Sequence, residues 1–216
     1  AADIVTDFIF EVKQSFSIEP RIINLGGGFG IKYTDEDDPL QPGEYVRLTL
    51  SALESACRKK GLKKPYVIFE PGRSIIGEAG LTLYTVGVVK DIPGIRKYVD
   101  IDGGITDNPR FILYGSKYDF TLANRAGDDK TDKVSIAGRC CESGDMLAKD
   151  IMLQPAVRGD ILAVYSTGAY NYSMSSNYNR VTKPAVVLVN NGSHEIIIKR
   201  ETCDDIIKND LMPSRL

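Results

Sequence analysis

The spacing of apolar residues along the chain changes near residue 80. Before that point, apolar residues at helical spacing alternate with short continuous apolar runs. The spacing predicts an amphipathic helix at the start of the chain. Its apolar positions are Ile4, Val5, Phe8, Ile9, Val12 and Phe16. A second helix is predicted to begin at Pro42, which suits a first helical position, and to end just before Gly61.

Two short apolar runs, at 21–25 and 65–69, have the pattern of buried strands. Strands that alternate with helices predict a parallel α/β sheet or barrel. In both architectures ligands lie at the carboxyl ends of the strands. The first run stops at the glycines 26–28 and the second at Glu-Pro-Gly-Arg, 70–73. We therefore expect both segments at the ligand-binding end.

After residue 80 the pattern becomes that of short strands separated by turn residues. The strand-like runs are 81–89, 97–101, 133–137, 160–164, 185–189 and 195–199. Such a series predicts an antiparallel β-domain, either a barrel or a sandwich. We therefore expect two domains, residues 1–80 and residues 81–216.

Composition excludes several classes of function. The chain is 43% hydrophobic and 26% charged, with a net charge of −2, so nothing favours nucleic acid or an anionic membrane as a partner. Its longest apolar run, Pro184–Val189, is too short to span a bilayer, and its first residues lack a signal-peptide pattern.

Four cysteines are too few for a disulfide scaffold, and we expect free thiols in a reducing cytoplasm. No Cys/His pattern suggests zinc, and the acidic run 34–38 matches no calcium loop, so we expect no metal.

Few groups are available for acid–base chemistry. The single histidine, His194, follows the hairpin-turn pair Asn191-Gly192, so histidine is a poor candidate for base, relay or ligand. A thiol and a carboxylate, Cys141 and Glu142, lie side by side between two glycines. If the protein moves protons, cysteine and glutamate must carry this chemistry, with a cofactor supplying the electronics.

Each motif of the first domain has a structural and a functional interpretation. The glycines in 26–30 would expose backbone N–H groups to an anion, or would form a tight turn after a strand. They match neither a Walker loop nor a dinucleotide fingerprint. Glu70 and Arg73 would face a cationic ring nitrogen and an anion, or would form a local ion pair.

The same choice arises in the second domain. Arg110 and Tyr114 would each hold a carboxylate, or would be a surface arginine and a packed tyrosine. Tyr170 has two further tyrosines within nine residues, a cluster that also suits core packing. Cys140 and Cys141 would be small buried hydrophobes, or reactive thiols in a polar, partly exposed setting.

Taken in order, five motifs resemble one enzyme family. They are Gly-Gly-Gly-Phe-Gly at 26–30, Glu-Pro-Gly-Arg at 70–73, Asp-Gly-Gly followed by Asp-Asn-Pro-Arg and Tyr-Gly within 102–115, Cys-Glu-Ser-Gly-Asp at 141–145, and Gly-Ala-Tyr followed by Ser-Met, Ser and Tyr-Asn within 168–179. They look like the diaminopimelate decarboxylases, in the alanine-racemase-like group of pyridoxal-phosphate enzymes. The resemblance implies the C-terminal part of a cofactor-binding (β/α)₈ barrel, followed by an antiparallel β-barrel or sandwich domain.

The resemblance also implies a set of cofactor contacts. Gly27, Gly28 and Gly72 would hold the phosphate of pyridoxal 5′-phosphate. Glu70 would act in catalysis by pairing with the pyridine nitrogen, because a carboxylate there favours the protonated ring, the better electron sink. Arg73 and Tyr170 would touch both cofactor and substrate.

Substrate contacts follow from the same resemblance. Arg110 and Tyr114, together with Arg73 and Tyr170, would bind the amino-acid substrate. Glu142 would recognise the amino group at its far end. Cys141 would return a proton to the α-carbon after CO₂ leaves.

The family forms homodimers in which the segment of Cys141 and Glu142 reaches the partner subunit's site, so the resemblance implies shared active sites. The implied reaction converts meso-2,6-diaminopimelate to L-lysine, the last step of lysine biosynthesis. No lysine here matches the context of the family's Schiff-base lysine. We therefore expect a C-terminal half that is inactive without the N-terminal half of the barrel. The alternatives are a decarboxylase of a polyamine precursor (ornithine, arginine or carboxynorspermidine) and a non-catalytic regulatory relative.

Overall fold

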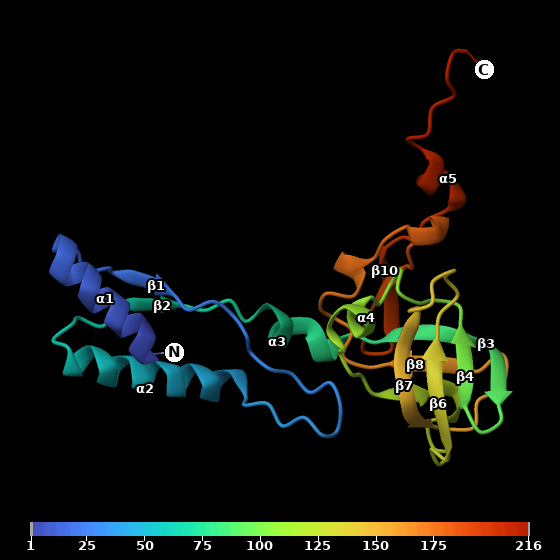
Figure 1. Ribbon diagram of the computed structural model, residues 1–216, viewed down its shortest axis with the longest axis horizontal. Coiled ribbons are helices and arrows are strands. Elements are labelled where there is room, and N and C mark those ends of the chain that lie inside the picture. The colour runs from blue at the N-terminus through green and yellow to red at the C-terminus, as the bar shows by residue number, and fades with distance from the viewer. Residues whose placement is uncertain (1, 216) are drawn as a thin grey trace. The chain divides into compact units, whose positions relative to one another are not determined.

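The structure is a computed structural model that describes residues 2–215. The chain divides into two compact units between Glu78 and Ala79. The elements of the first unit are α1 (Ala2–Phe16), β1 (Ile22–Asn24), α2 (Pro42–Lys59), β2 (Tyr66–Ile68) and α3 (Gly72–Ile76), followed by the 3₁₀ turn η1 (Gly77–Ala79). β1 and β2 pair in parallel (Figure 1). Both predicted helices and both predicted strands of this region are confirmed.

In the first unit, the helices cover one face of the strand pair. The buried cluster consists of Ile9, Leu53, Cys57 and Leu62. Ile23 and Val67, the middle residues of the two strands, pack against it. Because side chains alternate along a strand, the neighbouring Ile22 and Tyr66 point the other way and are 59% and 78% exposed. This unit therefore buries its strands on one side only.

The second unit is built on a six-stranded mixed sheet. Its strands are β3 (Thr82–Ile92), β4 (Arg96–Ile101), β5 (Phe120–Leu122), β6 (Asp132–Ala137), β7 (Met146–Leu153) and β8 (Ile161–Val164). Their order is β5-β8-β3-β4-β6-β7. The short helix α4 (Arg110–Tyr114) and the 3₁₀ turn η2 (Ala123–Arg125) lie between β4 and β6 in the chain.

One pairing departs from the antiparallel sheet that the sequence predicts. β4 and β6 run parallel, with Val99 opposite Ile136, whereas the other pairings of this sheet are antiparallel. Parallel neighbours require a long crossover. The chain makes this crossover through residues 102–131, which include α4 and β5. Apolar patterning does not reveal strand direction, so the expectation was wrong at this pair.

Gln154, directly after β7, brings the sheet close to closure. Its buried side chain donates from Nε2 to Thr121 Oγ1 over 2.9 Å and accepts at Oε1 from the Leu122 N–H over 3.1 Å. Both partners lie in β5, at the other end of the strand order. The sheet is therefore nearly closed and barrel-like. Its fully buried side chains include Val86, Val99, Leu122, Val134, Ile136, Leu147, Leu162 and Val164.

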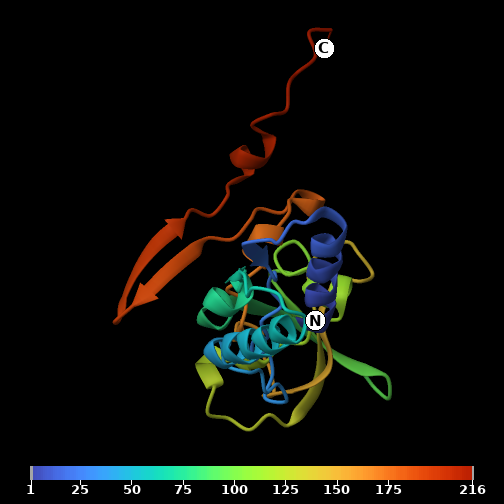
Figure 2. The ribbon, with the colours of Figure 1, turned by 90° about the vertical axis from the view of Figure 1, so that its left-hand side faces the viewer.

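A hairpin and a short helix follow the sheet. β9 (Val186–Asn190) and β10 (Ser193–Ile198) pair antiparallel around Asn191 and Gly192, both at positive φ. This confirms the predicted turn and places His194 in β10, directly after that turn. The hairpin extends away from the six-stranded sheet (Figure 2). α5 (Cys203–Ile207) begins at a Thr202–Asp205 capping box. Within residues 2–215, no helix is both long and apolar enough to cross a bilayer.

Two strands, β5 and β7, were not predicted. β5 has three residues, too few to show a period. β7 carries Lys149-Asp150 in its centre, with Asp150 at φ 55°, and its register with β6 shifts near this point. The irregularity interrupts the alternation of apolar and polar positions by which a strand is recognised.

We expect Gln154→Leu to lower the free energy of unfolding by about 2 kcal/mol, because a buried Leu122 N–H loses its acceptor. Denaturant unfolding followed by circular dichroism measures the change. Met152→Leu, at a half-exposed position of β7, is the control and should change the midpoint little. Equal midpoints for both variants would contradict the closing role of Gln154.

Candidate functional site

In the first unit, the segment after β1 is shaped by its glycines, and residues 26–30 are called the glycine segment below. Pairing with β2 continues beyond the strands, since Leu25 N–H donates to Ile68 O over 3.0 Å and Glu70 N–H donates to Gly26 O over 2.8 Å. A Cβ on Gly27 would lie 2.4 Å from Glu70 O, so only glycine fits at this position. Gly28, at φ +88°, has a backbone conformation that favours glycine.

Glu70 is oriented by a residue that sequence analysis did not single out. Asn24, the last residue of β1, donates from Nδ2 to Glu70 Oε1 over 2.5 Å. Its Oδ1 accepts from the Gly26 N–H over 2.7 Å. One amide side chain therefore fixes both the carboxylate and the start of the glycine segment. A polar residue at a strand end was the only sequence signal for it.

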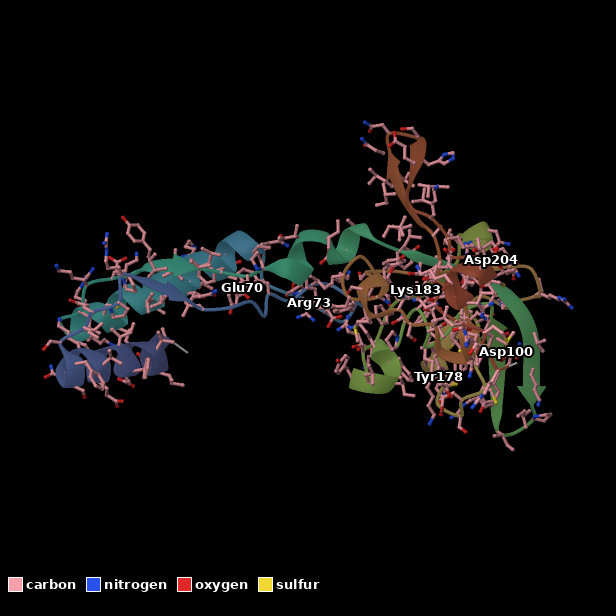
Figure 3. The ribbon with its side chains drawn as sticks, turned by 90° about the horizontal axis from the view of Figure 1, so that it is seen from above. Glu70, Arg73, Asp100, Tyr178, Lys183 and Asp204 are labelled. Atoms are coloured by element: carbon pink, nitrogen blue, oxygen red, sulfur yellow. The ribbon has the colours of Figure 1, made fainter. Side chains whose placement is uncertain are left out.

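Arg73 also holds the glycine segment. Its Nε and Nη2 donate to Phe29 O over 3.4 and 3.3 Å, and its guanidinium lies 5.7 Å from the Tyr33 ring centroid. Among the described residues, no ion pair joins Arg73 to Glu70, so the local ion-pair interpretation was wrong. Glu70 and Arg73 flank the start of α3, at Gly72 (Figure 3).

The fit of a phosphate to the glycine segment rests on its backbone. Within residues 2–215, the N–H groups of Gly27 and Gly28 donate to no protein acceptor. Successive free N–H groups in a glycine turn form a concavity suited to an anion. The segment therefore has the chemistry that a phosphate ester requires.

In the second unit, the buried carboxylate of Asp145 joins two loops. One is 102–109, between β4 and α4, and the other is 138–145, between β6 and β7. It is 4% exposed and accepts from the Ile105 N–H and from the Cys140 N–H, each over 2.7 Å. A Cβ on Gly104 or Gly138 would lie 2.4 or 2.2 Å from its oxygens. Both glycines are therefore required for the loops to close on the carboxylate.

A second buried pair shapes the first of these loops. The Tyr84 hydroxyl donates to Asp107 Oδ2, and Asp107 Oδ1 accepts from the Gly104 N–H over 3.0 Å. Burial, then the charge of Asp107, raises the pKa of Tyr84 well above its ordinary value. Tyr84 therefore stays a protonated donor beneath the loop.

The loop 102–109 leads into Arg110, and the segment after β8 carries Tyr170 to the same place. Arg110 is 7% exposed, so the surface interpretation was wrong. Its Nη1 lies 3.2 Å from the Tyr118 hydroxyl, and its guanidinium lies 4.9 Å from the Tyr170 ring centroid. Tyr170 is 46% exposed and has φ 73°, so it is not a core residue. Tyr114, at the end of α4, is exposed rather than packed.

The two adjacent cysteines have different surroundings. Cys141 is an exposed free thiol, whereas Cys140 is half-buried. Burial, then the charge of Asp145, raises the pKa of the Cys140 thiol. The interpretation of both as buried hydrophobes was therefore wrong for Cys141.

Glu142 and the backbone of Cys141 contact one turn, η4 (Tyr178–Arg180). The Tyr178 hydroxyl donates to Glu142 Oε2 over 3.3 Å, and Cys141 N–H donates to Asn179 Oδ1 over 2.8 Å. The sequence motif that begins at Gly168 ends on Tyr178 and Asn179. Sequence analysis gave neither residue a role, because neither lies near 141–142 in the chain.

Comparison with known families gives one match over most of the chain. Residues 4–168 match the model of the pyridoxal-dependent decarboxylase C-terminal sheet domain. The chain is 50% identical over 211 residues to the diaminopimelate decarboxylase of Bacillus subtilis, covering 98% of this chain and 48% of that protein. It is 48% identical over 201 residues to the Bacillus methanolicus enzyme, covering 93% and 46%. The chain thus spans about half the length of the curated relatives it matches.

Several solved structures are similar over nearly the whole chain, among them two from different organisms. The diaminopimelate decarboxylase of M. jannaschii, in complex with L-lysine, has a TM-score of 0.89 at 33% identity and covers 100% of this chain and 48% of that one. The Helicobacter pylori enzyme, also in complex with L-lysine, has a TM-score of 0.81 at 27% identity, covering 97% and 49%.

We expect Asp145→Asn to lower the free energy of unfolding by about 2 to 3 kcal/mol, because an amide NH₂ would face the Ile105 or Cys140 N–H in a buried site. Asp210→Asn is the matched control, since Asp210 makes a single exposed ion pair with Arg180 and should matter little. Urea midpoints compare the two. A loss as small for Asp145→Asn as for the control would show that the carboxylate does not hold the loops.

Proposed function

The chain belongs to the pyridoxal-dependent decarboxylase family, and from this premise we propose that its protein releases CO₂ from meso-2,6-diaminopimelate to give L-lysine. The observation that carries the substrate assignment is the exposed Cys141 thiol beside a Glu142 carboxylate that a neighbouring turn holds in place. Similarity to the diaminopimelate decarboxylase of Bacillus subtilis, at 50% identity over 211 residues, supports it. Because the chain spans about half of these relatives, the activity is proposed for the full-length gene product.

We propose that the first unit binds the cofactor. The N–H groups of Gly27 and Gly28, with the backbone of Gly72 at the start of α3, would hold the phosphate of pyridoxal 5′-phosphate. When bound, the cofactor supplies an electron sink for the pair left behind by CO₂. Glu70, oriented by Asn24, would hold a proton on the ring nitrogen, because a carboxylate favours the cationic ring.

We propose that arginines and tyrosines bind the carboxylates of the substrate. Arg110 lies beneath the Tyr170 ring, where little water reaches its guanidinium, and a guanidinium binds a carboxylate through two parallel hydrogen bonds. Tyr114 and Arg73 would complete this set. Glu142 would bind the ammonium group at the far end of the substrate, because an ionised carboxylate accepts hydrogen bonds from a cation.

We assign the returning proton to Cys141. After CO₂ leaves, the α-carbon needs a proton, and the exposed Cys141 thiol can reach a ligand outside the unit. Cys140 is a poorer donor, since burial raises the pKa of its thiol. We further propose a homodimer in which 141–142 reach the partner subunit's site. The free thiols of all four cysteines support a cytoplasmic setting.

The full-length gene product, loaded with pyridoxal phosphate, tests the substrate assignment. We expect CO₂ release from meso-diaminopimelate and none from ornithine, arginine or carboxynorspermidine. If CO₂ is released from ornithine, arginine or carboxynorspermidine but not from meso-diaminopimelate, the protein is a decarboxylase of a polyamine precursor. Absence of release from all four would support a regulatory relative.

We expect Cys141→Ala to lower kcat by about a hundredfold or more, because a positioned acid is lost, while the cofactor absorbance band remains. Cys203→Ala, at another exposed free thiol, is the control and should keep the wild-type kcat. Loss of the absorbance band in Cys141→Ala would contradict the role of proton donor.

A further inference from the structure

The segment 176–179 contacts both loops of the second-unit site. Ser176 N–H donates to Thr106 O over 2.8 Å, which ties the segment to the loop that precedes Arg110. Tyr178 and Asn179 reach the other loop, at Glu142 and Cys141. Four consecutive residues therefore connect the two loops.

The segment is itself anchored. Asn177 Nδ2 donates to Val181 O over 3.0 Å and to Glu201 Oε2 over 2.6 Å. Asn179 has φ 54°, in the left-handed region where asparagine is tolerated better than most residues. Tyr178 and Asn179 therefore reach 141–142 from a backbone held at both ends of the turn.

From these contacts we propose that Tyr178 is the positioning residue that sets the specificity of Glu142 for an ammonium group. The inference rests on the proposed function. A carboxylate that rotates freely presents its lone pairs in many directions. When it accepts a hydrogen bond from a fixed donor, its remaining lone pairs point in few directions. Tyr178 Oη holds Oε2, and the Gly144 N–H lies 3.4 Å from Oε1.

The tyrosine hydroxyl suits this task chemically. It donates without adding a positive charge that would compete with the substrate's ammonium group. Burial, then the charge of Glu142, raises the pKa of Tyr178, so the hydroxyl stays protonated where the carboxylate is ionised. Tyr178, labelled in Figure 3, is 44% exposed.

The substitution Tyr178→Phe, in the full-length protein loaded with pyridoxal phosphate, removes only the hydroxyl. We expect KM for meso-diaminopimelate to rise about tenfold, with kcat within about twofold of wild type, because a hydrogen bond to a charged group orients the binding carboxylate. Tyr165→Phe, 42% exposed at the end of β8, is the matched control and should leave both constants unchanged.

Two inhibitors separate recognition of the ammonium group from general damage. The amino group distal to the reacting carbon becomes the α-amino group of L-lysine, and 6-aminohexanoate lacks it. Tyr178→Phe should weaken inhibition by L-lysine about tenfold and leave inhibition by 6-aminohexanoate unchanged. In a Glu142→Gln background it should have no further effect.

The outcomes distinguish this inference from the proposed function. If the wild type releases no CO₂ from meso-diaminopimelate, the proposed function fails and this inference fails with it. If the wild type is active but Tyr178→Phe retains its KM, or weakens both inhibitors equally, or acts equally in the Glu142→Gln background, only the role of Tyr178 is overturned.

Discussion

The arrangement of the second unit depends on the buried carboxylate of Asp145. A charge removed from water is tolerated only where hydrogen bonds replace its hydration. Here backbone N–H groups of residues 105 and 140 do so, which means that the charge is satisfied only when both loops are in place. The glycines at 104 and 138 follow from the same constraint, since any side chain there would occupy the space of the carboxylate.

This constraint separates the roles of two adjacent thiols. Cys140 gives its N–H to Asp145 and is drawn toward the buried charge, while Cys141 gives its N–H to Asn179 and remains exposed. A thiol close to a buried carboxylate resists ionisation, whereas an exposed one can meet a ligand. The difference arises from the direction in which the loop turns and not from the chemistry of the residues.

The first unit solves a similar problem with an uncharged side chain. Asn24 is hydrogen-bonded to both the Glu70 carboxylate and the Gly26 N–H. Arg73 donates to the Phe29 carbonyl of the same glycine segment. Within residues 2–215, the Glu70 carboxylate forms no ion pair with an arginine or lysine, and Arg73 donates to Phe29 O instead. A carboxylate that has no basic partner of its own is better able to pair with a cationic ring.

The sequence by itself determined α1, α2, β1 and β2 of the first unit, the turn of the terminal hairpin and the motifs that identify the family. These are local properties, because propensity, period and turn chemistry act over a few neighbouring residues. It did not determine β5 and β7, the parallel pairing of β4 with β6, or the side-chain bonds of Gln154. The roles given to the site residues remain predictions.

Only the tertiary structure decided which groups surround the candidate site. Asn24 meets Glu70 across 46 positions of sequence, and Tyr178 meets Glu142 across 36. The surroundings of Arg110, which is buried beneath a tyrosine rather than exposed, were likewise set by packing. Such contacts have no local signature, because folding brings together strand ends and loops whose separation along the chain carries no information about their distance in space.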